Sequence, residues 1–114
     1  MAWKWYPITS YKAETGGSKV SEYYASVQIM GTGFYGLIKF LKGGAIPDSI
    51  APATNPPGQR FYGYMDFQQM HMFVDLLRNE SPLNFGWLSE NPNLFQLMTG
   101  EEPVGEGDGV LAGG

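Results

Sequence analysis

The chain has 114 residues, the usual length of one domain, and its 43% hydrophobic and 15% aromatic residues are enough to build a core. A net charge of −4 argues against broad electrostatic binding to nucleic-acid phosphates or to anionic lipid. Because the sequence contains no cysteine, disulfides, thiolate metal sites and cysteine nucleophiles are excluded together. We also find no run of about 18 apolar residues and no secretion signal, so we expect a cytoplasmic protein without membrane association.

Two strands joined by a turn are predicted first. Residues 20–30 alternate between apolar and polar side chains, which is typical of a half-buried strand. A Gly-containing turn follows at 30–33, and residues 34–40 continue the alternation. The predicted inward side chains of this hairpin are Tyr23, Ala25, Val27, Ile29, Phe34, Ile38 and Phe40, with Gly36 between them.

The same turn spells "GTGFYG", with the glycine spacing of a dinucleotide-binding loop. Such a loop needs a full helix after it and an acidic residue about 20 positions on. Here the next segment is interrupted by Gly43 and Gly44, and Asp48 falls in a Pro-rich stretch. The context therefore favours a hairpin turn over a cofactor site.

Residues 42–59 are predicted to form a long loop because prolines and glycines interrupt them. Residues 60–65 are strand-like, and Asp66 with Gln69 has the pattern of a capping box before a helix that ends near Asn79. One helical stripe is predicted to pack on the core, and it consists of Phe67, Met70, Phe73, Val74 and Leu77.

Two segments around "NPN", 82–90 and 93–99, predict a second hairpin, which gives the order β-β-β-β-α-β-β. We expect one α+β domain over residues 1–105, in which a single antiparallel sheet of five to six strands packs one face on one main helix. Residues 106–114 are acidic and Gly-rich, and we expect a flexible tail there.

The segment "RFYGYMDF", from Arg60 to Phe67, resembles the RNP1 octapeptide of RNA-recognition-motif domains. Phe61 stands where that family has Gly, and the resemblance covers eight residues only. It implies that aromatic side chains of this segment stack on unpaired bases. Ordinary cross-strand packing is the alternative, and the acidic composition favours it.

His71 is the one histidine, and Asp75 follows it at i+4. The pair could be a general base with its orienting carboxylate, or half of a metal site. No second pair of ligands has suitable spacing, so we expect a local ion pair, no metal, no cofactor and no catalytic residue.

Alternation sends Phe34, Ile38, Phe40, Phe61 and Met65 toward the core and a group of tyrosines to the opposite face. We call this opposite surface the tyrosine face, because tyrosine rings with polar tips suit interfaces and stacking platforms. Its predicted members are Tyr24, Tyr35, Lys39, Arg60, Tyr62 and Tyr64. Met72 and Leu76 fall outside the helical stripe and form a second candidate interface.

The functional prediction is a small, non-enzymatic interaction module that forms a homodimer or binds a protein partner through the tyrosine face. The alternative is a binding domain for a small ligand or for single-stranded nucleic acid, which uses the tyrosines as a stacking platform; the charge makes nucleic acid the less favoured partner. An enzyme built around His71 ranks third.

Overall fold

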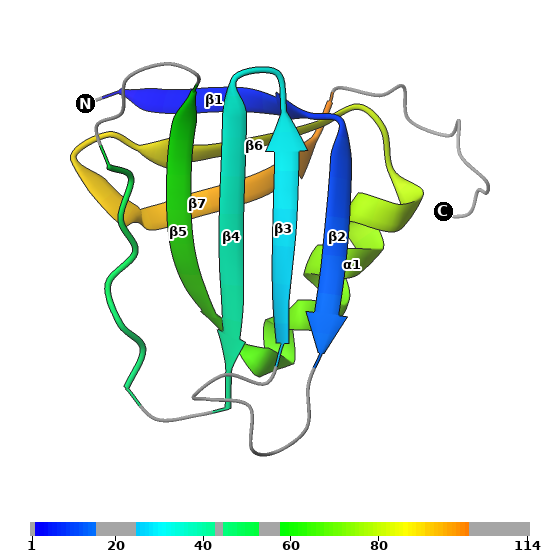
Figure 1. Ribbon diagram of the computed structural model, residues 1–114, viewed down its shortest axis with the longest axis vertical. Coiled ribbons are helices and arrows are strands. Elements are labelled where there is room, and N and C mark those ends of the chain that lie inside the picture. Colours follow the sequence, from blue (N-terminus) through cyan, green and yellow to red (C-terminus); the bar gives the residue numbers. More distant parts are fainter. Residues whose placement is uncertain (1, 16–24, 43–44, 53–57, 101–114) are drawn as a thin grey trace.

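The computed structural model describes residues 2–15, 25–42, 45–52 and 58–100 (Figure 1). Tyr23, Tyr24 and the predicted tail at 106–114 lie outside these ranges. Among the described residues, no helix is both long and apolar enough to cross a bilayer. The elements, in chain order, are β1 (Trp3–Ile8), β2 (Ser10–Thr15), β3 (Ala25–Gly31), β4 (Phe34–Leu41), β5 (Gln59–Asp66), a 3₁₀ turn (Phe67–Gln69), α1 (Met70–Asn79), β6 (Leu83–Leu88) and β7 (Asn91–Thr99).

The strands form two sheets that pack face to face, which corrects the prediction of a single antiparallel sheet. One sheet has the order β1-β6-β7 and the other the order β2-β3-β4-β5. Five strands, not four, precede the helix. The protein is mostly sheet with one short helix, and Figure 1 shows α1 behind the four-stranded sheet, beside the three-stranded one.

The two predicted hairpins are present. β3 pairs antiparallel with β4 around Gly33, whose φ of 72° suits glycine at a tight turn. β6 pairs antiparallel with β7. The pairing of β4 with β5 is different, because the connection returns the chain to the start of β4, so β5 runs parallel to it. The four-stranded sheet is therefore mixed.

A sharp bend at Thr9 carries the chain from one sheet to the other. The Thr9 N–H donates to the carbonyl oxygen of Met30 at 2.8 Å, which fixes the corner to the end of β3. A Cβ on Gly31 would collide with the carbonyl oxygen of Pro7, so only glycine permits this close approach. The corner places β1 in one sheet and β2 in the other.

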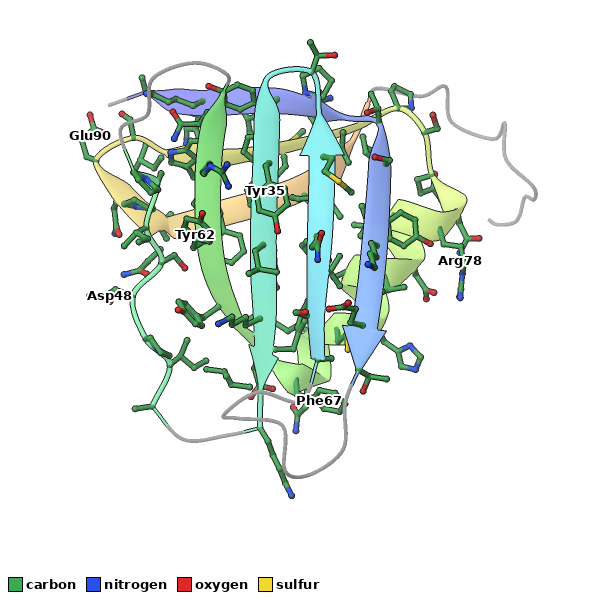
Figure 2. All side chains as sticks on the ribbon, viewed as in Figure 1. Tyr35, Asp48, Tyr62, Phe67, Arg78 and Glu90 are labelled. Carbon is green, nitrogen blue, oxygen red and sulfur yellow. The ribbon has the colours of Figure 1, made fainter. Side chains whose placement is uncertain are left out.

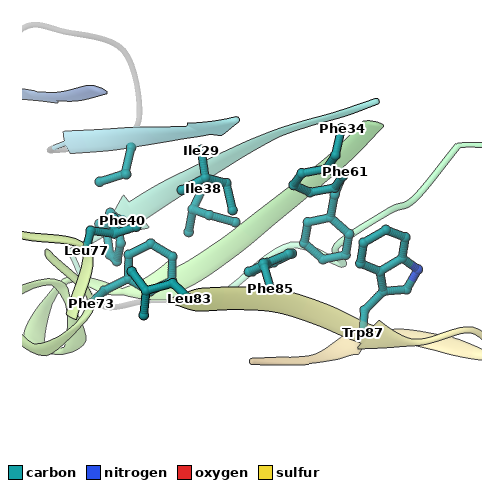
Figure 3. Packing of buried hydrophobic residues seen from close by; sticks show 11 residues of the cluster. Ile29, Phe34, Ile38, Phe40, Phe61, Phe73, Leu77, Leu83, Phe85 and Trp87 are labelled. Carbon is teal, nitrogen blue, oxygen red and sulfur yellow. The ribbon is translucent and has the colours of Figure 1, made fainter. Parts of the chain in front are cut away.

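The core lies between the sheets and is rich in aromatic rings (Figure 3). The Phe61 ring lies 4.9 Å from Trp87 and 5.1 Å from Phe85, centroid to centroid. The predicted inward side chains that the structure describes are buried here, and Met65 packs partly buried against them. The cluster consists of Val27, Ile29, Phe34, Ile38, Phe40, Phe61, Phe73, Leu77, Leu83, Phe85 and Trp87.

The helix contributes Phe73 and Leu77 to this core, as its stripe predicts. Phe67 is an exception, because it lies in the 3₁₀ turn before α1 begins and is 39% exposed. The Asp66 side chain accepts a hydrogen bond from the backbone N–H of Gln68 at 3.0 Å, so its capping role applies to that turn. The α-helix itself starts only at Met70.

Candidate functional site

The outer side of the four-stranded sheet carries the tyrosine face. On β4 the buried Phe34, Gly36, Ile38 and Phe40 alternate with half-buried residues, among them Tyr35 and Lys39. On β5 the buried Phe61 and Gly63 alternate with Tyr62 and Tyr64 in the same way. Figure 2 looks onto this side of the sheet and shows Tyr35 and Tyr62 on neighbouring strands.

The parallel register of β4 and β5 brings the predicted residues together in cross-strand pairs. Tyr35 pairs with Arg60, and Lys39 pairs with Tyr64. Between these two pairs, Leu37 pairs with Tyr62. Paired residues point to the same side of a sheet, so the five predicted side chains that the structure describes lie on one surface with Leu37 among them.

Residues 45–52 extend this surface beyond β5. Ile50 forms an antiparallel bridge with Tyr62, in which each backbone N–H donates to the other residue's carbonyl oxygen, at 2.9 and 2.8 Å. The Ile50 side chain is 53% exposed and lies on the same side as Tyr62. Leu37, Tyr62 and Ile50 therefore form a row of three large side chains across the sheet.

Charged residues, most of them basic, lie among and beside the aromatic rings of the face. The Arg60 guanidinium carbon lies 5.6 Å from the centroid of the Tyr35 ring, a cation–π distance. Lys39 lies two residues from Leu37 along the same side of β4, and Lys12 on β2 is opposite Gln28 in the same sheet. Glu14, on the same side of β2, forms an ion pair with Lys12 at 3.8 Å. The surface is thus apolar and aromatic at its centre, with charged side chains of both signs beside it.

Sequence reasoning missed Leu37 and Ile50. The alternation that placed Tyr35 and Lys39 outward also places Leu37 outward, so that signal was present. Ile50 had no such signal, because it lies in a Pro-rich segment without periodicity, and only its bridge to Tyr62 brings it to the face.

The second candidate interface, at Met72 and Leu76, lies on the other side of the molecule. Met72 is 71% exposed, whereas Leu76 is half-buried and packs against the core. Both line a cavity of about 480 Å³ between α1 and β7.

The predicted ion pair of His71 with Asp75 is wrong. The Asp75 carboxylate accepts instead from the guanidinium of Arg78, three residues along, at 3.0 Å. An exposed arginine at i+3 is the partner, and His71 is itself exposed on the helix. In the described part of the chain, no three His, Asp or Glu side chains lie close enough together to hold a metal ion.

A third aromatic surface, which the sequence did not single out, is on the outer side of the three-stranded sheet. Trp3 and Trp5 stack there with ring centroids 5.4 Å apart and are 39% and 40% exposed. The Trp5 ring lies over Gly86, where a Cβ would collide with it. Leu94 and Met98 on β7 are also exposed.

Comparison of the chain with protein-family models, with curated protein sequences and with solved structures gives no match.

Proposed function

We propose that the protein is a non-enzymatic interaction module that self-associates through the tyrosine face. The observation that supports this most directly is the row of Leu37, Tyr62 and Ile50, where β4, β5 and the bridged segment present adjoining apolar side chains. Contiguous apolar surface on the outside of a protein commonly marks an interaction site.

The composition of the face agrees with an interface between proteins. Tyrosine and arginine are the residue types that, with tryptophan, most often dominate binding energy at such surfaces. In a dimer with two-fold symmetry each copy presents the same patch, so Arg60 of one copy can lie over a tyrosine ring of the other. The half-buried Tyr62 and Tyr64 would then lose their remaining contact with water.

Sedimentation equilibrium of the full chain over a range of concentrations tests the proposal. We expect a monomer–dimer equilibrium that the double variant Tyr62→Ala/Tyr64→Ala weakens by about tenfold or more, as loss of hot-spot side chains does. The matched control is Trp3→Ala/Trp5→Ala, which removes two exposed rings from the opposite sheet and should leave the equilibrium unchanged.

A wild-type chain that stays monomeric throughout the range would contradict the proposal, as would a dimer that only the tryptophan variant disrupts. Chemical denaturation at several protein concentrations shows whether folding and association are inseparable, because an obligate dimer has no stable folded monomer at low concentration, whereas a monomer that also dimerises keeps its own stability there.

The alternative function, binding of a small ligand or single-stranded nucleic acid, is favoured by the cation–π pair of Arg60 and Tyr35. Successive bases stack on aromatic rings while basic side chains contact the phosphates. Fluorescence anisotropy of a labelled oligothymidylate measures this directly. Saturable binding that weakens from 50 to 200 mM salt (roughly the range over which phosphate contacts are lost) and disappears in the double tyrosine variant would favour this function over dimerisation.

A further inference from the structure

The cavity between α1 and β7 follows the edge of a strand. Its lining from β7 consists of four consecutive residues, 95–98. Successive residues of a strand point to opposite faces of the sheet, so a cavity that touches all four must lie against the strand's edge. The helix forms the other wall, and the complete lining is Met65, Gln68, Gln69, Met72, Phe73, Leu76, Phe95, Gln96, Leu97 and Met98.

The backbone at this edge has hydrogen-bonding groups that no described residue pairs with. Among the described strands, β7 is at the edge of its sheet and pairs only with β6. Within the described ranges, the backbone of residues 95–98 forms no hydrogen bond outside that pairing. In an antiparallel pair, alternate N–H and C=O groups point away from the neighbouring strand, here into the cavity.

Along residues 95–98 the edge has no charge and no proline, whereas Pro92 and the irregular pairing beside Leu88 lie at the other end of β7. Proteins block exposed edges with charged side chains, proline or bulges. The segment Asn93–Thr99 of β7 contains no charge and no proline. An uncharged edge of this length is a template for pairing with another extended chain.

The lining is apolar and neutral. It includes three methionines and three glutamines, and none of its ten residues carries a charge. Met72 and Met98, on opposite walls, are 71% and 46% exposed. Methionine side chains adapt to differently shaped partners, and glutamine amides can both donate and accept hydrogen bonds.

We propose that this groove binds an extended, uncharged peptide segment of a partner protein, which adds to β7 as a fourth strand of its sheet. Main-chain hydrogen bonds to β7 provide affinity that is independent of sequence, and pockets for alternate side chains provide selectivity. Four lining residues at about 3.3 Å each correspond to a bound segment of roughly four to five residues.

The position of α1 excludes a second copy of the same strand as the occupant. β7 of another copy is already paired with its own β6. If the β7 of that copy were inserted beside this one, its own β6 would have to occupy the space of α1, which forms the opposite wall of the groove. A single extended chain has no such neighbour, so it needs only the space of the cavity between β7 and α1.

The two sides of the groove define the side-chain pattern of the bound segment. Phe95 and Leu97 lie on the core side of β7, where Phe73 is also buried. Gln96 and Met98 lie on the outer side. Alternate positions facing the core side should therefore be apolar, and the intervening positions should be uncharged and tolerate water.

NMR titration of the full chain with the blocked peptide acetyl-Thr-Val-Thr-Val-Thr-Val-amide tests the proposal. We expect saturable shifts at the amides of residues 95–98 and slowed hydrogen exchange at those that point away from β6. A fully N-methylated peptide of the same sequence keeps the side chains but has no main-chain donors. It should bind about tenfold more weakly or worse, since tenfold corresponds to the net free energy of only one or two hydrogen bonds.

Two protein variants localise the effect. Met72→Lys places a charge in the groove at an exposed position and should weaken binding by about tenfold, because the ammonium must be desolvated by the bound chain. Leu94→Lys makes the same change on β7 outside the lining and should bind like the wild type. Tyr62→Ala/Tyr64→Ala should also bind normally, so failure here is distinguishable from failure of the dimer proposal.

Several results would overturn the inference. The groove would be a plain apolar pocket if the N-methylated peptide bound equally well. Shifts on the tyrosine face would place the peptide site there and not in the groove. No shifts at millimolar peptide would show that the groove does not bind such a chain. Dimerisation abolished by Met72→Lys would show that another copy of the chain covers the groove.

Discussion

Phe73 joins the helix to both the sheet and the groove. Its ring packs edge-on against Phe40 with centroids 5.6 Å apart, and it is 5% exposed. The same side chain forms part of the groove lining. A core contact thus also determines the distance between α1 and β7.

We predict that Phe73→Ala lowers the free energy of unfolding by about 3–5 kcal/mol, because it removes buried area and leaves a cavity. Leu77→Ala should cost about 2–5 kcal/mol for the same reason. Urea denaturation followed by circular dichroism measures both. The control is His71→Ala, an exposed position on the same helix, which should change stability by less than about 0.5 kcal/mol. A larger loss for His71 than for Phe73 would contradict the packing described here.

The residue-scale pattern was largely predictable because alternation depends only on the chain's own periodicity. Phe34, Ile38 and Phe61 are buried, and their tyrosine neighbours point outward, as period two requires. Alternation does not say which face of an unassigned strand is inward. The exposed Trp3 and Trp5, whose size suggests a core, were therefore not recognisable as surface residues.

Among the elements, the segment at 48–50 links the two sheets at the side of β5. The Ser49 backbone N–H donates to the side-chain oxygen of Asn93 at 2.7 Å, and the Asn93 amide donates to Asp48 at 3.1 Å. The Ser49 hydroxyl in turn accepts from the N–H of Tyr64 at 3.2 Å. One asparagine on β7 thus holds the segment that places Ile50 beside the tyrosine face.

We predict that Asn93→Ala costs about 1–3 kcal/mol, because the N–H of the buried Ser49 is left without its acceptor. Hydrogen exchange at residues 48–50 should accelerate in this variant. Asn84→Ala, on β6 in the same sheet, serves as the control and should leave exchange at 48–50 unchanged. Unaltered exchange in Asn93→Ala would mean that the bridge between Ile50 and Tyr62 holds the segment by itself.

The pairing of elements could not be predicted as well as their existence. A half-buried strand has the same period whether its neighbour is parallel or antiparallel, so residues 60–65 revealed a strand but not its direction. The direction depends on where the connection 42–59 returns the chain, and proline-rich segments carry no periodic signal for that. Assignment of all the strands to one sheet failed for the same reason.

At the scale of the whole molecule, the two sheets share one core. Tyr6 of β1 stacks on Phe34 of β4 at 4.9 Å and on Trp87 of β6 at 5.5 Å, so a single ring contacts both sheets. Each inner face is covered mainly by the other sheet, and α1 adds Phe73 and Leu77 to the same core. The sheets should therefore unfold together.

We predict one cooperative transition in chemical denaturation, as expected for a single small domain. The variant Trp3→Phe/Trp5→Phe leaves Trp87, which is 2% exposed, as the sole tryptophan. Its fluorescence reports the three-stranded sheet, while hydrogen exchange at β3 and β4 reports the four-stranded one. Coincident midpoints are expected, and two separated midpoints would show that one sheet persists without the other.

The location of β1 determines when this strand can form its hydrogen bonds during synthesis of the chain. β1 pairs Trp3 with Leu88 and Ile8 with Leu83, so the first strand has its only hydrogen-bonded neighbour near the end of the described chain. During synthesis, β1 must remain without its partner until β6 has left the ribosome. Pairings this distant also slow folding, to roughly the millisecond-to-second range of sheet-rich domains. In a nascent chain, Trp3 and Trp5 therefore lack their neighbouring strand until Leu88 has been released.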